Sequence, residues 1–126
     1  MSVAASEGVL EGTSISWTGT NFTLKNEQHN SSSAIRTSDS NHFRCYAGSK
    51  TTISGNDGAK VSQVVITCTG SSYATALNNS IDKTLYTVEV NDLVITITPK
   101  DGAVDSIEIV TGKQWRLNNI VVFCEK

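Results

Sequence analysis

The sequence has little of what catalysis or membrane insertion requires. It has two histidines and one proline in 126 residues; 17% of its residues are charged and 6% are aromatic. It contains no cluster of metal ligands at a familiar spacing, no nucleophile motif and no glycine-rich phosphate loop. Its apolar runs are only a few residues long, so we predict no membrane-spanning segment. These features favour a binding or structural module over an enzyme.

The charge on the chain is small and has no strong bias. The formal net charge is −2 and the pI is near 5.6. Nucleic-acid binding depends on a concentrated basic surface, which this composition does not supply. We therefore expect neither nucleic acid nor a membrane among the partners.

What the chain does contain is β-forming and polar. Val, Ile and Thr account for 37 residues, against 24 for Leu, Ala, Met, Glu and Gln together. β-Branched side chains pack well on a pleated sheet and lose rotamer freedom in a helix. Ser, Thr and Asn make up about a third of the chain. This is a surface chemistry usual in extracellular β-modules and virion proteins.

Short β-branched runs bounded by turn residues predict the fold. The clearest runs are Val61–Thr69, Tyr86–Val90, Leu93–Thr98 and Asn119–Cys124. Eight or nine strands of this kind favour an all-β fold, a single-domain antiparallel β-sandwich of the jelly-roll or Greek-key type. We assign this domain to residues 9–126 and a flexible amino-terminal arm to residues 1–8.

The sequence also allows predictions for three segments outside these runs. Met1–Gly8 has neither a basic region nor an apolar core, so it is not a signal peptide, and we expect a complete gene product. Asn26–Asn41 is mostly polar and predicts a long excursion from the sheet, the kind of place where binding residues are found. Gly70–Lys83 is polar as well, and we expect a loop with a short helical turn at Ala74–Leu77.

Three cysteines, Cys45, Cys68 and Cys124, cannot all pair within one chain. Cys68 and Cys124 both end apolar strand runs and could lie side by side on neighbouring strands. Free cysteines are often small buried hydrophobes, and we take this as the simpler interpretation for all three. Their spacing does not fit a zinc site.

Aromatic and amide side chains are the candidates for glycan binding. A sugar ring offers CH faces to an aromatic ring and hydroxyl groups to neighbouring polar side chains. Tyr73 lies near Asn78 and Asn79 in a predicted loop, and Trp115 precedes Arg116 in the last strand. Trp17 and Tyr86 alternate with apolar residues, so we assign both to the core.

The two histidines are the candidates for catalytic chemistry. His29 and His42 lie in the polar excursion with Ser38, Asp39 and Ser40, so the residue types of a Ser-His-Asp triad occur together there. No nucleophile elbow or oxyanion loop accompanies them. We therefore predict no catalytic residue and keep both histidines as candidates for external contact.

Turn chemistry accounts for the acidic residues that are candidates for calcium binding. Asp57, Asp92 and Asp101 all lie beside Asn or Gly in predicted turns. Calcium requires six to eight oxygen ligands, and the sequence lacks the dense acidic loop that would supply them. We expect no metal and no cofactor.

The order of several segments resembles a known group of proteins. Ala34-Ile35-Arg36, the Phe43–Gly48 strand, the Val61–Cys68 strand and the closing Gly112–Val122 segment follow one another. This order is similar to small β-sandwich modules of secreted and surface proteins of gut Bacteroidota, and of phages that infect these bacteria. The resemblance spans about Ala34–Phe123 and implies a fold and a setting at a cell or virion surface. It transfers no site residues.

Taken together, these features predict a non-enzymatic module on the surface of a phage virion. Because the chain is a single domain without a leader, it looks more like a phage structural protein, a capsid decoration or auxiliary protein with oligomeric contacts to other virion proteins. It would also be able to contact polysaccharide. The alternative is a carbohydrate-binding or adhesin module of a secreted bacterial protein, located at the cell surface; a small hydrolase is a third and weaker interpretation.

Overall fold

The computed structural model describes residues 9–11, 14–28 and 43–125 and confirms the all-β prediction. These residues form ten strands and one helix. Two strands have only three residues, and the eight longer ones agree with the expected eight or nine. The elements are β1 (Val9–Glu11), β2 (Ser14–Thr18), β3 (Phe22–Gln28), β4 (Phe43–Cys45), β5 (Ser49–Gly55), β6 (Lys60–Cys68), α1 (Ser71–Ser80), β7 (Tyr86–Asn91), β8 (Val94–Pro99), β9 (Ser106–Val110) and β10 (Trp115–Glu125).

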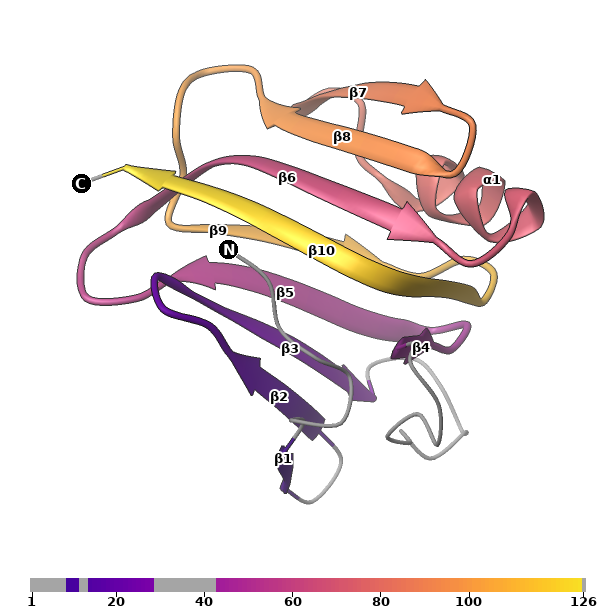
Figure 1. Cartoon of the computed structure of the whole chain (residues 1–126), viewed down its shortest axis with the longest axis horizontal. Helices are drawn as coiled ribbons and strands as arrows, with labels where there is room; N and C mark the ends of the chain where they lie inside the picture. The colour runs from indigo at the N-terminus through magenta and orange to yellow at the C-terminus, as the bar shows by residue number, and fades with distance from the viewer. Residues whose placement is uncertain (1–8, 12–13, 29–42, 126) are drawn as a thin grey trace.

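The strands form two antiparallel sheets of five strands each. Sheet A has the order β1-β2-β3-β5-β9, and sheet B has the order β4-β10-β6-β8-β7. Successive strands belong to different sheets at five points: β3 and β4, β4 and β5, β5 and β6, β8 and β9, and β9 and β10. Figure 1 shows β7, β8, β6 and β10 in the upper half of the molecule and β5, β3 and β2 below them.

Alternation along the strands explains how the two sheets enclose one core. In β6, Val64, Ile66 and Cys68 are fully buried while the residues between them are partly accessible, as the sequence predicts. Val64 is paired with Val122 of β10 and Ile66 with Ile120, so one apolar face runs across neighbouring strands. One continuous cluster of buried side chains includes residues from both sheets and the helix. The fold is therefore held by packing between the sheets.

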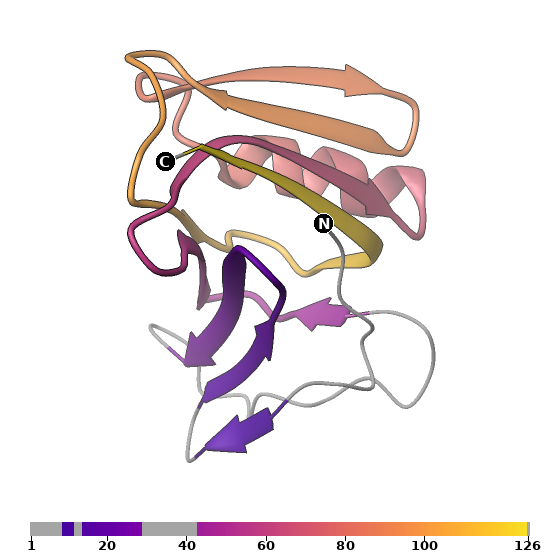
Figure 2. The ribbon, with the colours of Figure 1, turned by 60° about the vertical axis from the view of Figure 1, so that its left-hand side comes forward.

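Helix α1 packs against sheet B on the side that faces the core. Ala74 and Leu77 are buried within the shared core cluster, and the helix contacts β10, β6, β7 and β8. Figure 2 shows the helix behind β6 in the view. In Figure 1 it lies beside the carboxyl-terminal end of β6. Sheet A and α1 thus cover the inner face of sheet B together.

A small polar cluster is buried at one end of this core. Asn26 Nδ2 donates to Ser49 Oγ at 3.1 Å and to Thr51 Oγ1 at 2.9 Å. Ser49 Oγ donates to the Tyr46 carbonyl at 2.6 Å, and Thr51 Oγ1 donates to Cys45 Sγ at 3.6 Å. These bonds tie β3, β4 and β5 together inside the core, where an unpaired polar group is costly.

Tight turns join the strands where the sequence predicts them. Strand β5 ends at Gly55 and β6 begins at Lys60, and between them Asp57 and Gly58 have φ angles of 54° and 82°. Asp92 joins β7 to β8 with φ 55°. Glycine, and to a lesser degree aspartate, adopts such left-handed angles at modest cost, so the Asn-Asp-Gly and Asn-Asp signals mark real turns.

Candidate binding surfaces

The predicted glycan-contact residues Tyr73, Asn78 and Asn79 lie on helix α1, so the prediction of a loop with one helical turn was wrong for this segment. The helix begins after Gly70 and buries Leu77 against the sheet. Ser and Asn side chains dominate its sequence, and their weak helix preference made the segment resemble a loop. A signal was present nevertheless, because residues 73, 74, 77 and 81 are apolar at helical spacing.

Tyr73 is half-buried and carries a cation over its ring. The Arg116 guanidinium carbon lies 5.3 Å from the ring centroid. In the amide orientation that satisfies both partners, the Gln114 side-chain oxygen accepts from Arg116 Nε at 2.8 Å and from a terminal guanidinium nitrogen at 3.1 Å. Tyr73, Arg116 and Gln114 thus form a compact polar and aromatic group, and Asn79 is exposed on the same helix.

Trp115 is fully buried, and its proposed role as a sugar platform is wrong. Its indole Nε1 donates to Thr111 Oγ1 at 3.1 Å, and Thr111 is itself buried. A ring without exposed surface cannot stack on a ligand. Trp17 and Tyr86 are buried at 3% and 7% exposure, which confirms their assignment to the core.

The two histidine candidates, His29 and His42, lie outside the described residues. Ser38, Asp39 and Ser40 lie outside them as well. Within the described ranges, no group of three or more His, Cys, Asp or Glu side chains lies close enough together to hold a metal ion. The prediction that the excursion begins at Asn26 was wrong, because β3 continues to Gln28 and Asn26 is buried. Residues 29–41 of the excursion lie outside the described part of the chain.

The three cysteines are free thiols, and the suggested juxtaposition of Cys68 with Cys124 does not occur. Cys68 lies opposite Leu117, whereas Cys124 lies opposite Val61. Because β6 and β10 are antiparallel, two residues near the carboxyl ends of these strands lie at opposite ends of the ladder. Burial raises the pKa of the Cys45 thiol to about 12 and that of Cys68 to about 11. These thiols are unreactive core residues.

No described element covers the outward surface of sheet B. We define the B face as the twelve central outward-facing residues on its four longer strands, and only Glu89 among them is charged. Lys60, Arg116 and Glu125 lie near the ends of the same strands. In β10, β6 and β8 the residues of the B face alternate with buried ones. The B face consists of Asn119, Val121 and Phe123 of β10, Gln63, Val65 and Thr67 of β6, Val94, Thr96 and Thr98 of β8, and Thr87, Glu89 and Asn91 of β7.

Apolar and hydroxyl side chains form continuous rows on the B face. Val121 lies opposite Val65, which lies opposite Thr96. Phe123 is 49% exposed and lies opposite Gln63. Gln63 Nε2 donates to Thr98 Oγ1 at 3.1 Å, so this row is ordered across three strands. The B face is therefore accessible, and it carries one charged side chain.

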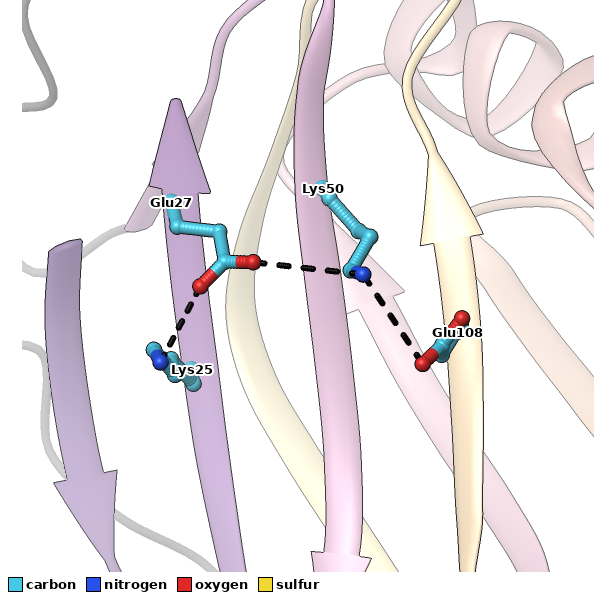
Figure 3. A network of polar contacts seen from close by, with 4 residues as sticks. All are labelled: Lys25, Glu27, Lys50 and Glu108. Carbon is cyan, nitrogen blue, oxygen red and sulfur yellow. Dashed lines mark ion pairs between the residues drawn. The ribbon is translucent and has the colours of Figure 1, made fainter. Parts of the chain in front are cut away.

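The outward surface of sheet A has the opposite character. Figure 3 shows a network of charged side chains that crosses β3, β5 and β9. Lys25 Nζ lies 3.0 Å from a Glu27 carboxylate oxygen, and Lys50 Nζ lies 3.9 Å from Glu27 and 3.8 Å from Glu108. Such exposed ion pairs contribute little to stability, but they make this surface well hydrated. The two outer surfaces of the sandwich therefore differ strongly in charge.

A cleft of about 440 Å³ lies between β9 and the chain that leads from α1 into β7. We call it the β9 cleft; its lining residues are Ser80, Asp82, Leu85, Tyr86, Ser106, Glu108 and Val110. Hydrogen bonds from Thr84 hold the pKa of Asp82 below its ordinary value. Burial is the main cause of a raised pKa at Tyr86. The sequence analysis missed this cleft, because its two walls are twenty or more residues apart along the chain.

Comparisons with protein families, with curated proteins and with solved structures found no match. Across the described residues, no helix is both long enough and apolar enough to cross a membrane.

Proposed function

We propose that this protein is a non-enzymatic structural module of a phage virion surface, a decoration or auxiliary protein of the capsid. It docks on another virion protein through the B face. The observation that carries the proposal is the contrast between the two outer surfaces of the sandwich. One bears a network of four charged side chains, and the other presents one charge in twelve residues.

Depletion of charge is the property that distinguishes the core of a protein interface from the rest of a surface. The B face shows this depletion of charge, together with a half-exposed phenylalanine and a row of valines on four paired strands. Thr, Asn and Gln side chains around these valines offer hydrogen bonds without the desolvation cost of charge. A flat protein surface is the partner that such a face fits.

Two arguments support a location on the surface of a virion: the composition of the chain and its resemblance to other modules. A chain that is one-third Ser, Thr and Asn is suited to an exposed particle surface. The strand order resembles that of modules from gut Bacteroidota proteins and their phages. Both arguments favour a surface role and are independent of the B face.

Co-sedimentation with phage capsids assembled without the protein tests this function. Wild-type protein should pellet with the capsids. Val65→Lys places a charge in the centre of the B face and should leave the protein in the supernatant, because the lysine would have to be desolvated. Ser54→Lys is the matched control on the outer surface of sheet A, and it should pellet like wild type.

Far-UV circular dichroism must first confirm that both variants are folded. Failure of the wild-type protein to pellet, or equal pelleting of the two lysine variants, would contradict docking through the B face.

A polysaccharide-binding module is the second candidate, and the Tyr73 group favours it. A half-buried aromatic ring beside Arg116 and Gln114 can hold a sugar ring and its hydroxyl groups. Affinity electrophoresis through gels containing capsular, plant or mucin polysaccharides tests this candidate. Retardation that is lost in Tyr73→Ala and kept in Val65→Lys would support it, and no retardation in any gel would exclude these glycans.

A further inference from the structure

Strand β9 has an edge that no other described strand pairs with, and that edge forms one wall of the β9 cleft. It is the last strand of sheet A and pairs only with β5 among the described strands. Gly55 N–H donates to Asp105 O, and Thr111 N–H donates to Ser49 O. Antiparallel pairs alternate between hydrogen-bonded and non-hydrogen-bonded types, so these two bonds fix the pattern between them. It follows that the backbone groups of Ser106, Glu108 and Val110 point away from β5, into the cleft.

The opposite wall combines apolar and polar groups. Leu85 is 56% exposed, and across the cleft Val110 is 45% exposed, which makes them two of the most accessible large apolar side chains in the described residues. Tyr86 lines the cleft beside them. The backbone groups of Ser106, Glu108 and Val110 face this wall across the cleft.

The charge in the cleft has a single sign. Asp82 and Glu108 line it, and the lining includes no basic residue. Both hydrogen bonds that Asp82 receives from Thr84 end on Oδ1. Glu108 has Lys50 at 3.8 Å on the outer surface of sheet A, a long and exposed contact that leaves its carboxylate well hydrated. A cation entering the cleft would meet two carboxylates.

We propose that the β9 cleft binds an extended segment of a partner protein that carries a lysine or arginine side chain. The aliphatic part of that side chain lies against Leu85 and Val110, and its charged end lies between Asp82 and Glu108. Backbone groups of the segment bond to the open positions of the β9 edge, which is how sheets take up an added strand. This site is separate from the B face, and the proposal does not depend on the proposed function.

A second copy of the same chain fits this edge less well. Twofold pairing that uses all three outward positions of β9 places Glu108 opposite Glu108 of the other copy. Like charges directly opposite each other destabilise a sheet. The carboxylates therefore select a basic partner over a second copy.

A nuclear magnetic resonance titration tests the proposal. The probe is the peptide acetyl-Thr-Val-Lys-Val-Thr-amide, added to the ¹⁵N-labelled protein, and the control peptide carries Glu in place of Lys. The lysine peptide should cause saturable shifts of the amide signals of residues 80–86 and 106–110, and the control peptide should not. Glu108→Gln should weaken binding by up to about fivefold, the factor that corresponds to an exposed charge pair of about 1 kcal/mol. Glu89→Gln is a matched control that removes the same charge from the B face, outside the lining of the cleft, and it should leave binding unchanged.

Three results would overturn the proposal. The first is shifts that do not involve residues 106–110. The second is equal binding of the two peptides or equal weakening by the two variants. The third is a concentration-dependent shift of residues 106–110 without any peptide, which would identify a second copy as the occupant.

Discussion

Trp115 illustrates, at the scale of single residues, how one polar atom can fix a large side chain. The indole ring fills the core with no exposed surface, yet its N–H has a partner in Thr111 Oγ1. Thr111 lies in the turn that leads from β9 to β10, and its backbone N–H bonds to Ser49 of β5. The tryptophan therefore links the first residue of β10 to sheet A, and its contribution is to stability.

Removing either partner of this bond should destabilise the protein. Trp115→Phe loses the donor and part of the buried area, and Thr111→Val leaves the indole N–H unpaired in the core. We expect each to lower the free energy of unfolding by about 1–3 kcal/mol. Urea denaturation of both single variants and the double variant measures the coupling. A double variant as destabilised as the sum of the two single variants would contradict a shared hydrogen bond.

The buried thiols predict how stability depends on pH. Burial raises the pKa of Cys45 from 9.0 to about 12 and that of Cys68 from 9.0 to about 11. Between pH 9 and 11 the unfolded chain loses these thiol protons and the folded chain keeps them. The unfolded state then binds fewer protons, so stability is greatest below pH 9 and falls as the pH rises.

Urea midpoints at pH 8, 9 and 10 test this dependence. The free energy of unfolding of the wild type should fall more steeply above pH 9 than that of Cys45→Ala, by up to about 1.4 kcal/mol per pH unit. Cys124→Ala is the control, because its thiol is only half-buried and the steep fall should persist. Parallel curves for wild type and Cys45→Ala would show that the Cys45 thiol ionises alike in both states.

At the scale of elements, the β5–β6 connection depends on close approach as well as on backbone angles. A Cβ atom on Gly55 would lie 1.9 Å from the carbonyl oxygen of Ala59, so the backbone itself occupies the space. At Gly58 a Cβ would meet nothing within 4 Å, and its constraint is the φ of 82° alone. The two glycines of one turn are thus required for different reasons.

We expect Gly55→Ala to be the more damaging of the two substitutions. It forces the chain at Ala59 to shift and should cost about 1–3 kcal/mol or more. Gly58→Ala should cost about 1 kcal/mol, because only a left-handed conformation is penalised. Thermal and urea unfolding of both variants provide the comparison. A larger loss of stability in Gly58→Ala than in Gly55→Ala would mean that the backbone near Ala59 can shift at little energetic cost.

The sequence allowed the strands to be predicted more accurately than helix α1. The runs at Val61–Thr69 and Tyr86–Val90 correspond to β6 and β7 within one or two residues. Their alternation of apolar and polar side chains is a local property, so it can be read without the partner strands. In α1, Ser and Asn residues masked the helical spacing of Tyr73, Leu77 and Ile81, and burial against sheet B overrode their weak preference.

At the scale of the whole molecule, the candidate sites depend on which surfaces remain uncovered. The sequence predicts that Val65 and Val121 lie on the face opposite to Ile66 and Ile120. It does not predict that α1 and sheet A both pack on one side of sheet B, so the B face could not be anticipated. The β9 cleft was hidden for the same reason, since Asp82 and Glu108 are brought together only by the fold.

One tryptophan in each sheet allows a test of whether the sandwich unfolds as a unit. Trp17 belongs to sheet A and Trp115 to sheet B, and both lie in one core cluster. Trp17→Phe and Trp115→Phe each leave a single reporter. In each variant, tryptophan fluorescence and far-UV circular dichroism should give the same urea midpoint, because a shared core makes unfolding all-or-none. Two separate transitions in either variant would mean that the sheets unfold independently.

The position of β10 in sheet B constrains how the protein is made. This strand is the last to leave the ribosome among those described, yet it lies between β4 and β6 and is the only strand that pairs with β4 among the described residues. A nascent chain that has reached β9 has all of sheet A available but only β6, β8 and β7 of sheet B as a connected group. The edge of β6 that pairs with β10 must then remain unpaired until residues 115–125 emerge. Folding of this sandwich is therefore completed only after β10 has been synthesised, and a cell that produces it must keep that edge from pairing with other chains in the meantime.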